Sequence, residues 1–114
     1  MKMLPALAGA LAFALTTPIV APAHPTHQTI PSWWVSAALC VHEHEGSWRD
    51  SGAPYYGGMQ MDWAFMKNYG LRLLRTKGTA DHWTPHEQLH VAYRGWRKQG
   101  WGAWPVASRT CGLR

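Results

Sequence analysis

Acidic residues are scarce in this chain of 114 residues. Six Asp and Glu residues stand against eleven Lys and Arg residues, and the formal net charge at pH 7 is +5. This excess suits an anionic partner such as cell wall or nucleic acid, but it is mild. The basic residues form no run of like charge, so nothing points to nucleic-acid binding. The sequence also contains no internal repeat, no low-complexity segment and no sign of a second domain.

Long apolar runs are absent except at the N-terminus. Lys2 precedes an apolar stretch over residues 4–20, and Ala21-Pro22-Ala23 follows it as a small-residue cleavage site. This pattern predicts a secretory signal peptide over residues 1–23. Prolines and a glycine interrupt the stretch, which disfavours a membrane-spanning helix, although an uncleaved anchor is the alternative. Residues 24–31 are predicted to be a flexible lead, because they are polar and contain two prolines.

Cysteines are equally few. Removal of the first 23 of the 114 residues would leave 91, with a net charge of +4 because Lys2 is lost. A domain of this size often needs a covalent staple. Cys40 and Cys111 would meet an oxidising compartment, so one disulfide is predicted, worth on the order of 4 kcal/mol in the chain-entropy model. A free or metal-binding pair is the alternative, but there is no CxxC motif and no third cysteine.

The remaining segments predict a mainly helical domain over residues 32–114. Ser32, Asp62 and Thr84 are the expected helix N-caps, and Thr84 begins a capping box with Pro85 and Glu87. Glycines are expected to end the helices. The predicted helices cover about 33–44, 63–69, 71–77 and 85–98. Between them, 47–61 is expected to be an irregular loop or a short two-stranded ribbon, and 101–114 an irregular tail.

Eight tryptophans are many for so short a chain. Some must build the core, and the surplus is expected to line a groove, as aromatic rings do for sugars. Trp33, Trp34 and Trp63 occupy helical positions and are predicted to be core residues. Trp101 and Trp104 lie in a glycine-containing segment and are predicted to line the groove, with core packing as the alternative.

Two glutamates end the first predicted helix, directly before an aromatic, glycine-rich segment. Glu45 continues the apolar stripe of Trp34 and Val41, whereas Glu43 lies about 200° around the helix. Burial raises a carboxyl pKa, and a general acid for glycosidic cleavage needs a carboxyl that keeps its proton near neutral pH. Glu45 is therefore the predicted acid and Glu43 the runner-up. The alternative for both is an ordinary surface glutamate.

A second carboxylate is harder to assign. Glycoside hydrolases commonly use a pair, and the candidates here are Asp50 and Asp62. Asp62 is already predicted to cap a helix, and nothing in the sequence requires Asp50 to face Glu45. A mechanism with one carboxylate is therefore open.

A rival motif is His86-Glu87-Gln88-Leu89-His90, which matches the H-E-x-x-H pattern of zinc proteases. It begins in the first turn of its helix, and the capping box already explains Glu87. No His, Asp or Glu follows His90 to supply a third ligand. A zinc peptidase that uses His86 and His90 is thus a lesser alternative, and no metal or cofactor is predicted.

Two further segments resemble the catalytic domain of resuscitation-promoting factors, which are secreted actinobacterial transglycosylase-like enzymes of the lysozyme-like superfamily. They are YYGGMQ over residues 55–60 and QGWGAWP over residues 99–105. The resemblance runs from about Ser32 to Cys111. It implies a small α+β, mainly α, lysozyme-like domain with a disulfide between Cys40 and Cys111. It also implies a secreted, cell-wall-associated protein that has no stable membrane association after signal cleavage.

The resemblance further implies cleavage of MurNAc-β-1,4-GlcNAc bonds in the glycan strands of peptidoglycan. One Glu would act as acid and then base, without a cofactor. Counting back from Trp48 gives Glu43 as that residue, whereas the wider transglycosylase pattern Glu-Ser-x-aromatic gives Glu45, with Gly46 in place of Ser. Helix-face reasoning also gives Glu45.

Residues that match positions lining the family's cleft are expected to bind substrate. These are Tyr55, Tyr56 and Gln60, and the resemblance assigns Trp101 and Trp104 to the base of the domain or to the cleft edge. A non-catalytic peptidoglycan-binding module on the same fold is the alternative function. The sequence leaves open whether a cell-wall endopeptidase acts as a partner.

Overall fold

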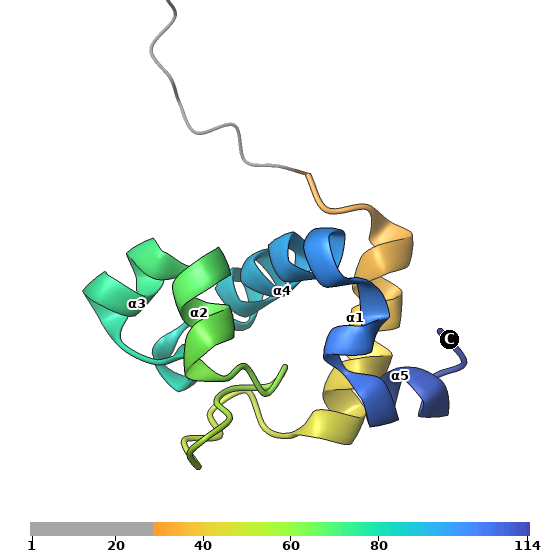
Figure 1. The fold of residues 1–114 in the computed structure, drawn as a ribbon, viewed down its shortest axis with the longest axis horizontal. Helices are drawn as coiled ribbons and strands as arrows, with labels where there is room; N and C mark the ends of the chain where they lie inside the picture. Colours follow the sequence, from red (N-terminus) through yellow and green to blue (C-terminus); the bar gives the residue numbers. More distant parts are fainter. Residues whose placement is uncertain (1–28) are drawn as a thin grey trace, which may run out of the picture.

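The computed structural model describes residues 29–114, and the domain that it shows is mainly helical (Figure 1). The predicted signal peptide over 1–23 lies outside the described residues, as does most of the predicted lead. Two short 3-10 helices interrupt the series of α-helices. In chain order the elements are α1 (Ser32–Glu45), α2 (Trp63–Tyr69), α3 (Leu71–Lys77), η1 (Ala80–His82), α4 (Pro85–Gln99), η2 (Gly100–Ala103) and α5 (Pro105–Thr110).

Local hydrogen bonds explain where the helices begin. The Asp62 side chain accepts a hydrogen bond from the Phe65 N–H at 2.8 Å, which confirms Asp62 as the N-cap of α2. Thr84 and Glu87 form the predicted capping box of α4. The prediction that Ser32 caps α1 is wrong. Pro31 occupies that position and Ser32 is already helical, because the Pro31 carbonyl accepts hydrogen bonds from the Trp34 and Val35 N–H groups.

Helix α4 is the centre of the domain (Figure 1). It packs against α2, η2 and α1, while α3 packs on α2 and α5 packs on α1. No helix in the described part of the chain is long and apolar enough to span a membrane. The core gathers side chains from α1, α2, η1, α4 and α5, from the loop before α2, and from Trp83 and Trp104. Its fully or almost fully buried apolar members are Trp34, Ala38, Val41, Met59, Met61, Met66, Ala80, Trp83, Leu89, Val91, Ala92, Trp104 and Ala107.

The loop between α1 and α2 contains the only β-pairing within residues 29–114. Tyr56 and Met61 form an isolated antiparallel bridge, in which each N–H donates to the other residue's carbonyl at 2.9 Å. The expected ribbon is thus a tight loop closed by one bridge. The bridge places Met59 and Met61 in the core and anchors the loop beside the end of α1.

The C-terminal segment is more regular than predicted. Cys40 and Cys111 form the predicted disulfide, with a sequence separation of 71. The prediction of an irregular tail is wrong, because η2 and α5 occupy most of it. Pro105 lies at the first turn of α5, where its missing N–H costs no helical hydrogen bond. The disulfide therefore joins α1 to the end of a second helix.

Two of the three tryptophans predicted to be core residues are exposed. Trp34 is fully buried, but Trp33 is 59% and Trp63 58% exposed. Trp33 follows the helix about 100° away from Trp34, and its ring rests edge-on against Trp96. Helical position was therefore a poor guide to burial for Trp33 and Trp63.

Candidate active site

Glu45 is the last residue of α1, and Gly46 ends the helix by donating its N–H to the His42 carbonyl. The Glu45 side chain is partly buried, whereas Glu43 is exposed. Removal from water raises the pKa of the Glu45 carboxyl above its ordinary value, and the charge of neighbouring His44 opposes this effect. Of the two glutamates, Glu45 thus has the setting that holds a proton.

Gly46 lies against a pair of polar side chains from the following loop. A Cβ at position 46 would lie 3.1 Å from Asp50 Oδ2 and 3.3 Å from Gln60 Nε2. These are tighter approaches than a side chain normally makes. The contact gives a physical reason for glycine here, where the wider transglycosylase pattern has serine, and it brings Asp50 and Gln60 to the residue after Glu45.

Asp50 is occupied on both carboxylate oxygens. Oδ1 accepts from the Gly52 N–H and Oδ2 accepts from Gln60 Nε2, each at 2.9 Å. The Gln60 amide also donates to the Gly57 carbonyl at 2.9 Å. Gln60 has a φ of 47°, the one positive value at a non-glycine residue between 29 and 114. Gln60 therefore has a fixed side-chain orientation and an unusual backbone conformation. Asp50 is one of the two acceptors that hold its side chain.

The buried side-chain amide of Gln88, whose role was not predicted from the sequence, holds the loop around Gly58 in place. Gln88 of α4 is fully buried. Its Oε1 accepts from the Gly58 N–H at 2.8 Å, and its Nε2 donates to the carbonyls of Trp48 and Trp83. The signal was present in the sequence, since Gln88 is a polar residue on the same helical face as Ala92 and Gly95.

His42 supports the same loop from α1. Its Nδ1 is 2.9 Å from the Gly58 carbonyl oxygen, and its ring stacks on Trp48 with centroids 3.8 Å apart. A Cβ on Gly58 would lie 2.4 Å from a Trp48 ring atom and 2.6 Å from His42 Nδ1. Only glycine lets the backbone lie this close to the stacked rings, so Gly58 is required for this packing.

The predicted substrate-binding residues divide into two groups. Tyr55 is 49% exposed and Tyr56 is half-buried, and Tyr55 and Gln60 line a cavity of about 190 Å³. Trp104 is almost fully buried and donates its indole N–H to the Met59 carbonyl at 2.7 Å, although it also lines that cavity. Trp101 stacks on buried Trp34. Both tryptophans therefore have structural contacts in addition to any role at the cavity.

A second cavity, of about 490 Å³, lies between the start of the loop and the start of α4. Its lining residues are Trp48, Arg49, Asp81, His82, Trp83, Thr84 and Pro85. Glu45 is not among the residues that line either of these two cavities. Gln60 lies beside Gly46, the residue that follows Glu45, and it also lines the smaller cavity.

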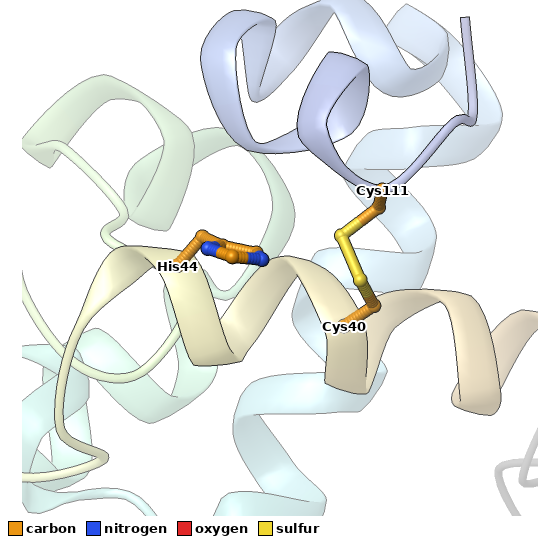
Figure 2. A group of neighbouring side chains, drawn as sticks. All are labelled: Cys40, His44 and Cys111. Atoms are coloured by element: carbon orange, nitrogen blue, oxygen red, sulfur yellow. A yellow bond between two sulfur atoms is a disulfide. The ribbon is translucent and has the colours of Figure 1, made fainter.

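Three potential metal ligands gather beside the disulfide. Figure 2 shows Cys40 and His44 on α1 and Cys111 at the end of α5, and their ligand atoms lie within 4.8 Å of one another. Both sulfur atoms are bonded to each other, and a metal binds the thiolate form of cysteine. In the disulfide form, His44 is therefore the one side chain of the three with a ligand atom to offer.

The residues of the H-E-x-x-H motif lie on α4. Glu87 accepts from the Thr84 N–H and pairs with Lys77 at 2.9 Å, and these hydrogen bonds lower its pKa. His86 and His90 approach each other at 3.1 Å between their Nε2 atoms. Within residues 29–114 no third His, Cys, Asp or Glu joins them in a metal-binding group.

Comparison with known proteins finds related sequences, among them two resuscitation-promoting factors. Over 83 residues the chain is 40% identical to resuscitation-promoting factor RpfB of Mycolicibacterium smegmatis, a match that covers 71% of this chain and 22% of the relative. Over 107 residues it is 35% identical to resuscitation-promoting factor Rpf1 of Corynebacterium glutamicum, covering 93% of this chain and 52% of the relative. The chain thus spans about half the length of one relative and about a fifth of the other. No protein-family profile matches it.

Proposed function

The chain carries a resuscitation-promoting-factor-like domain, and from this premise we propose that it cleaves the glycan strands of peptidoglycan. The bond is the MurNAc-β-1,4-GlcNAc linkage, and Glu45 is the catalytic residue. The observation that carries the proposal is the partly buried Glu45 carboxyl, whose pKa desolvation raises. A general acid needs this property to hold its proton near neutral pH.

The proposed reaction begins when the Glu45 carboxyl donates its proton to the glycosidic oxygen. The bond between C1 of MurNAc and that oxygen breaks, and the GlcNAc part leaves as an alcohol. The Glu45 carboxylate then takes a proton either from the O6 hydroxyl of the same MurNAc or from water as that oxygen attacks C1. The first route yields a 1,6-anhydro end and the second a reducing end.

The hydrogen bonding of Asp50 supports a mechanism with one carboxylate. Both of its oxygens already accept hydrogen bonds, from Gly52 and Gln60. In this proposal the N-acetyl group or the O6 hydroxyl of MurNAc does what a second carboxylate does in other glycosidases. Asp50 and the Gly57 carbonyl instead accept both N–H groups of Gln60, and in this proposal the Gln60 Oε1 accepts a hydrogen bond from the sugar.

The substrate-binding residues of the proposal are Tyr55, Tyr56 and Gln60, with Trp101 and Trp104 at the cleft edge. Exposed tyrosine rings suit the apolar faces of sugars, and the cavity beside Tyr55 combines aromatic with polar lining. The positive charge of the chain suits an anionic wall. We also propose that residues 1–23 direct secretion and that residues 32–114 act at the cell wall.

The test is mass spectrometry of the soluble products released from purified peptidoglycan. Wild type should release muropeptides with anhydro or reducing ends, and Glu45→Gln should release none above background. Glu43→Gln is the matched control on the exposed side of the same helix, and it should retain activity. Loss of products with Glu43→Gln alone would move the acid to Glu43. A chelator should leave the activity unchanged, whereas inhibition would favour the zinc peptidase.

A non-catalytic wall-binding module is the second candidate, because Glu45 lines neither of the two cavities. Such a module would use the aromatic and polar residues around Tyr55 and Gln60 without a proton donor. Wild type would then pellet with purified peptidoglycan but release no soluble product, and Glu45→Gln would pellet equally well. Product release by wild type would exclude this candidate.

A further inference from the structure

His86 and His90 form a pair that the proposed function does not use. They lie four positions apart on α4, so both side chains project from one face of the helix. Their Nε2 atoms are 3.1 Å apart, and their ring centroids are 4.5 Å apart at an interplanar angle of 73°. His86 is exposed and His90 is half-buried. The pair thus lies at the surface of the domain.

From this geometry we propose that His86 and His90 chelate one divalent transition-metal ion, Cu²⁺ in preference and Ni²⁺ next, through their two Nε2 atoms. Water would fill the remaining positions. Metal–imidazole bonds are about 2.0–2.1 Å long, so nitrogens 3.1 Å apart subtend an angle of about 95–102° at the ion. That angle lies between the right angle of neighbouring positions around a tetragonal or octahedral ion and the tetrahedral angle. The rings therefore need only a small movement to bind an ion of either geometry, and the affinity order of the metals decides the preference.

The helix holds the two ligands in place before the ion arrives. The capping box of Thr84 and Glu87 closes the first turn, where His86 lies. Glu87 is further tied to Lys77, whose ammonium contacts both carboxylate oxygens at 2.9 and 3.0 Å. The ion would replace the hydrogen bond between the Nε2 atoms of the two rings. The order of preference follows the general rise in affinity toward Cu²⁺ among first-row divalent ions.

Two electrostatic effects oppose the binding of a cation at this site, and they limit its affinity. The positive end of the α4 dipole lies close to His86, and the whole chain has a net charge of +5. The Glu87 carboxylate offsets part of this field but is paired with Lys77. Binding therefore depends on both imidazoles together, and removal of either one should abolish the chelate rather than weaken it slightly.

The test uses the full chain without a polyhistidine tag, in a buffer that does not coordinate metals. Isothermal titration with CuCl₂, and separately with NiCl₂, would compare wild type with His86→Ala and His90→Ala. Each substitution should weaken the tightest binding step at least tenfold. His82→Ala is the matched control, because the His82 side chain is 62% exposed and lies on η1 just before α4. It should bind copper as wild type does.

A second measurement keeps the test independent of folding defects. The electron paramagnetic resonance spectrum of the 1:1 copper complex should show coupling to two imidazole nitrogens in wild type, and this pattern should change in His86→Ala. Identical affinities and spectra for wild type and His86→Ala would overturn the proposal, as would no copper binding by wild type. Glu45→Gln should bind copper normally, so failure of the proposed glycan cleavage would leave this result unaffected.

Discussion

Gln88 and Gly58 lie thirty positions apart in sequence, yet the buried Gln88 Oε1 accepts a hydrogen bond from the Gly58 N–H at 2.8 Å. The Gln88 Nε2 donates to the Trp48 carbonyl at 2.9 Å and to the Trp83 carbonyl at 3.1 Å. One amide on the central helix thus ties together both ends of the loop that follows Glu45. The position of this loop depends on α4 as much as on the loop's own sequence.

Replacement of Gln88 by Leu should therefore destabilise the domain. It removes three hydrogen bonds and leaves the buried Gly58 N–H without its acceptor. We expect a loss of about 2–4 kcal/mol in the free energy of unfolding, measured by urea titration with circular dichroism. Gln99→Leu is the control, since Gln99 is exposed and donates to the Tyr69 hydroxyl, and it should cost less than about 1 kcal/mol. A Gln88→Leu protein as stable as wild type would contradict the argument.

Gly46→Ala should impair activity more than stability. The added Cβ would lie 3.1 Å from Asp50 Oδ2 and 3.3 Å from Gln60 Nε2, so the Asp50–Gln60 pair must shift. We expect a severalfold loss in the rate of peptidoglycan solubilisation, because Gln60 belongs to the proposed binding site.

Gly102→Ala is the matched control for that substitution. The nearest atom to a Cβ at position 102 is Arg114 Nη1 at 3.9 Å, an ordinary contact. This variant should solubilise peptidoglycan at the wild-type rate. Equal rates for Gly46→Ala and Gly102→Ala would show that the packing around Gly46 has no bearing on activity.

Structural features were predicted most accurately from the sequence where local hydrogen bonds decide them. Asp62 and the capping box at Thr84 are set by side chains within three residues of the groups that they bond, and both were predicted correctly. The disulfide was predictable because Cys40 and Cys111 are the only two cysteines. The YYGG segment indicated where the loop lies in the sequence. It did not indicate that Gln88 would hold the loop by hydrogen bonds.

Tertiary packing decided the features that the sequence did not reveal. Trp33 and Trp34 are adjacent on α1, yet only Trp34 faces the Tyr93 and Trp101 rings. Trp104 is ordered by a hydrogen bond to the Met59 carbonyl, 45 positions away. Neither relationship can be inferred from residues near in sequence. For the same reason Glu45 was predictable as a residue at a helix end, whereas the approach of Asp50 and Gln60 to its neighbour Gly46 was not.

Removal of the disulfide should destabilise the domain strongly. The bond closes a loop with a sequence separation of 71 residues, so Cys40→Ala combined with Cys111→Ala should lose about 4 kcal/mol in the chain-entropy model. Thermal and urea unfolding would measure the loss, and a reducing agent should lower the stability of wild type by a similar amount. A double variant within about 1 kcal/mol of wild type would mean that contacts between α1 and α5 suffice without the bond.

His44→Gln should move the alkaline limb of the activity profile. Desolvation raises the pKa of Glu45, and the charge of His44 lowers it. Without that charge the Glu45 pKa rises further, so the proposed acid keeps its proton to higher pH. The rate of glycan cleavage should therefore decline at a higher pH than in wild type. His82→Gln, at an exposed position whose charge does not contribute to the Glu45 pKa, should leave the limb in place, and a downward shift for His44→Gln would contradict the assignment.

The difference in unfolding free energy between Glu45→Gln and wild type should depend on pH in a defined direction. The pKa of the Glu45 carboxyl is raised on folding from an ordinary value of 4.5, so between these two values the folded state binds more protons than the unfolded state. The contribution of Glu45 to the stability of wild type therefore falls as the pH rises through that window, and then levels off. Glutamine carries no such penalty. In urea titrations, the advantage of Glu45→Gln over wild type should grow from acid to neutral pH, and a constant difference would mean that Glu45 is not desolvated in the folded protein.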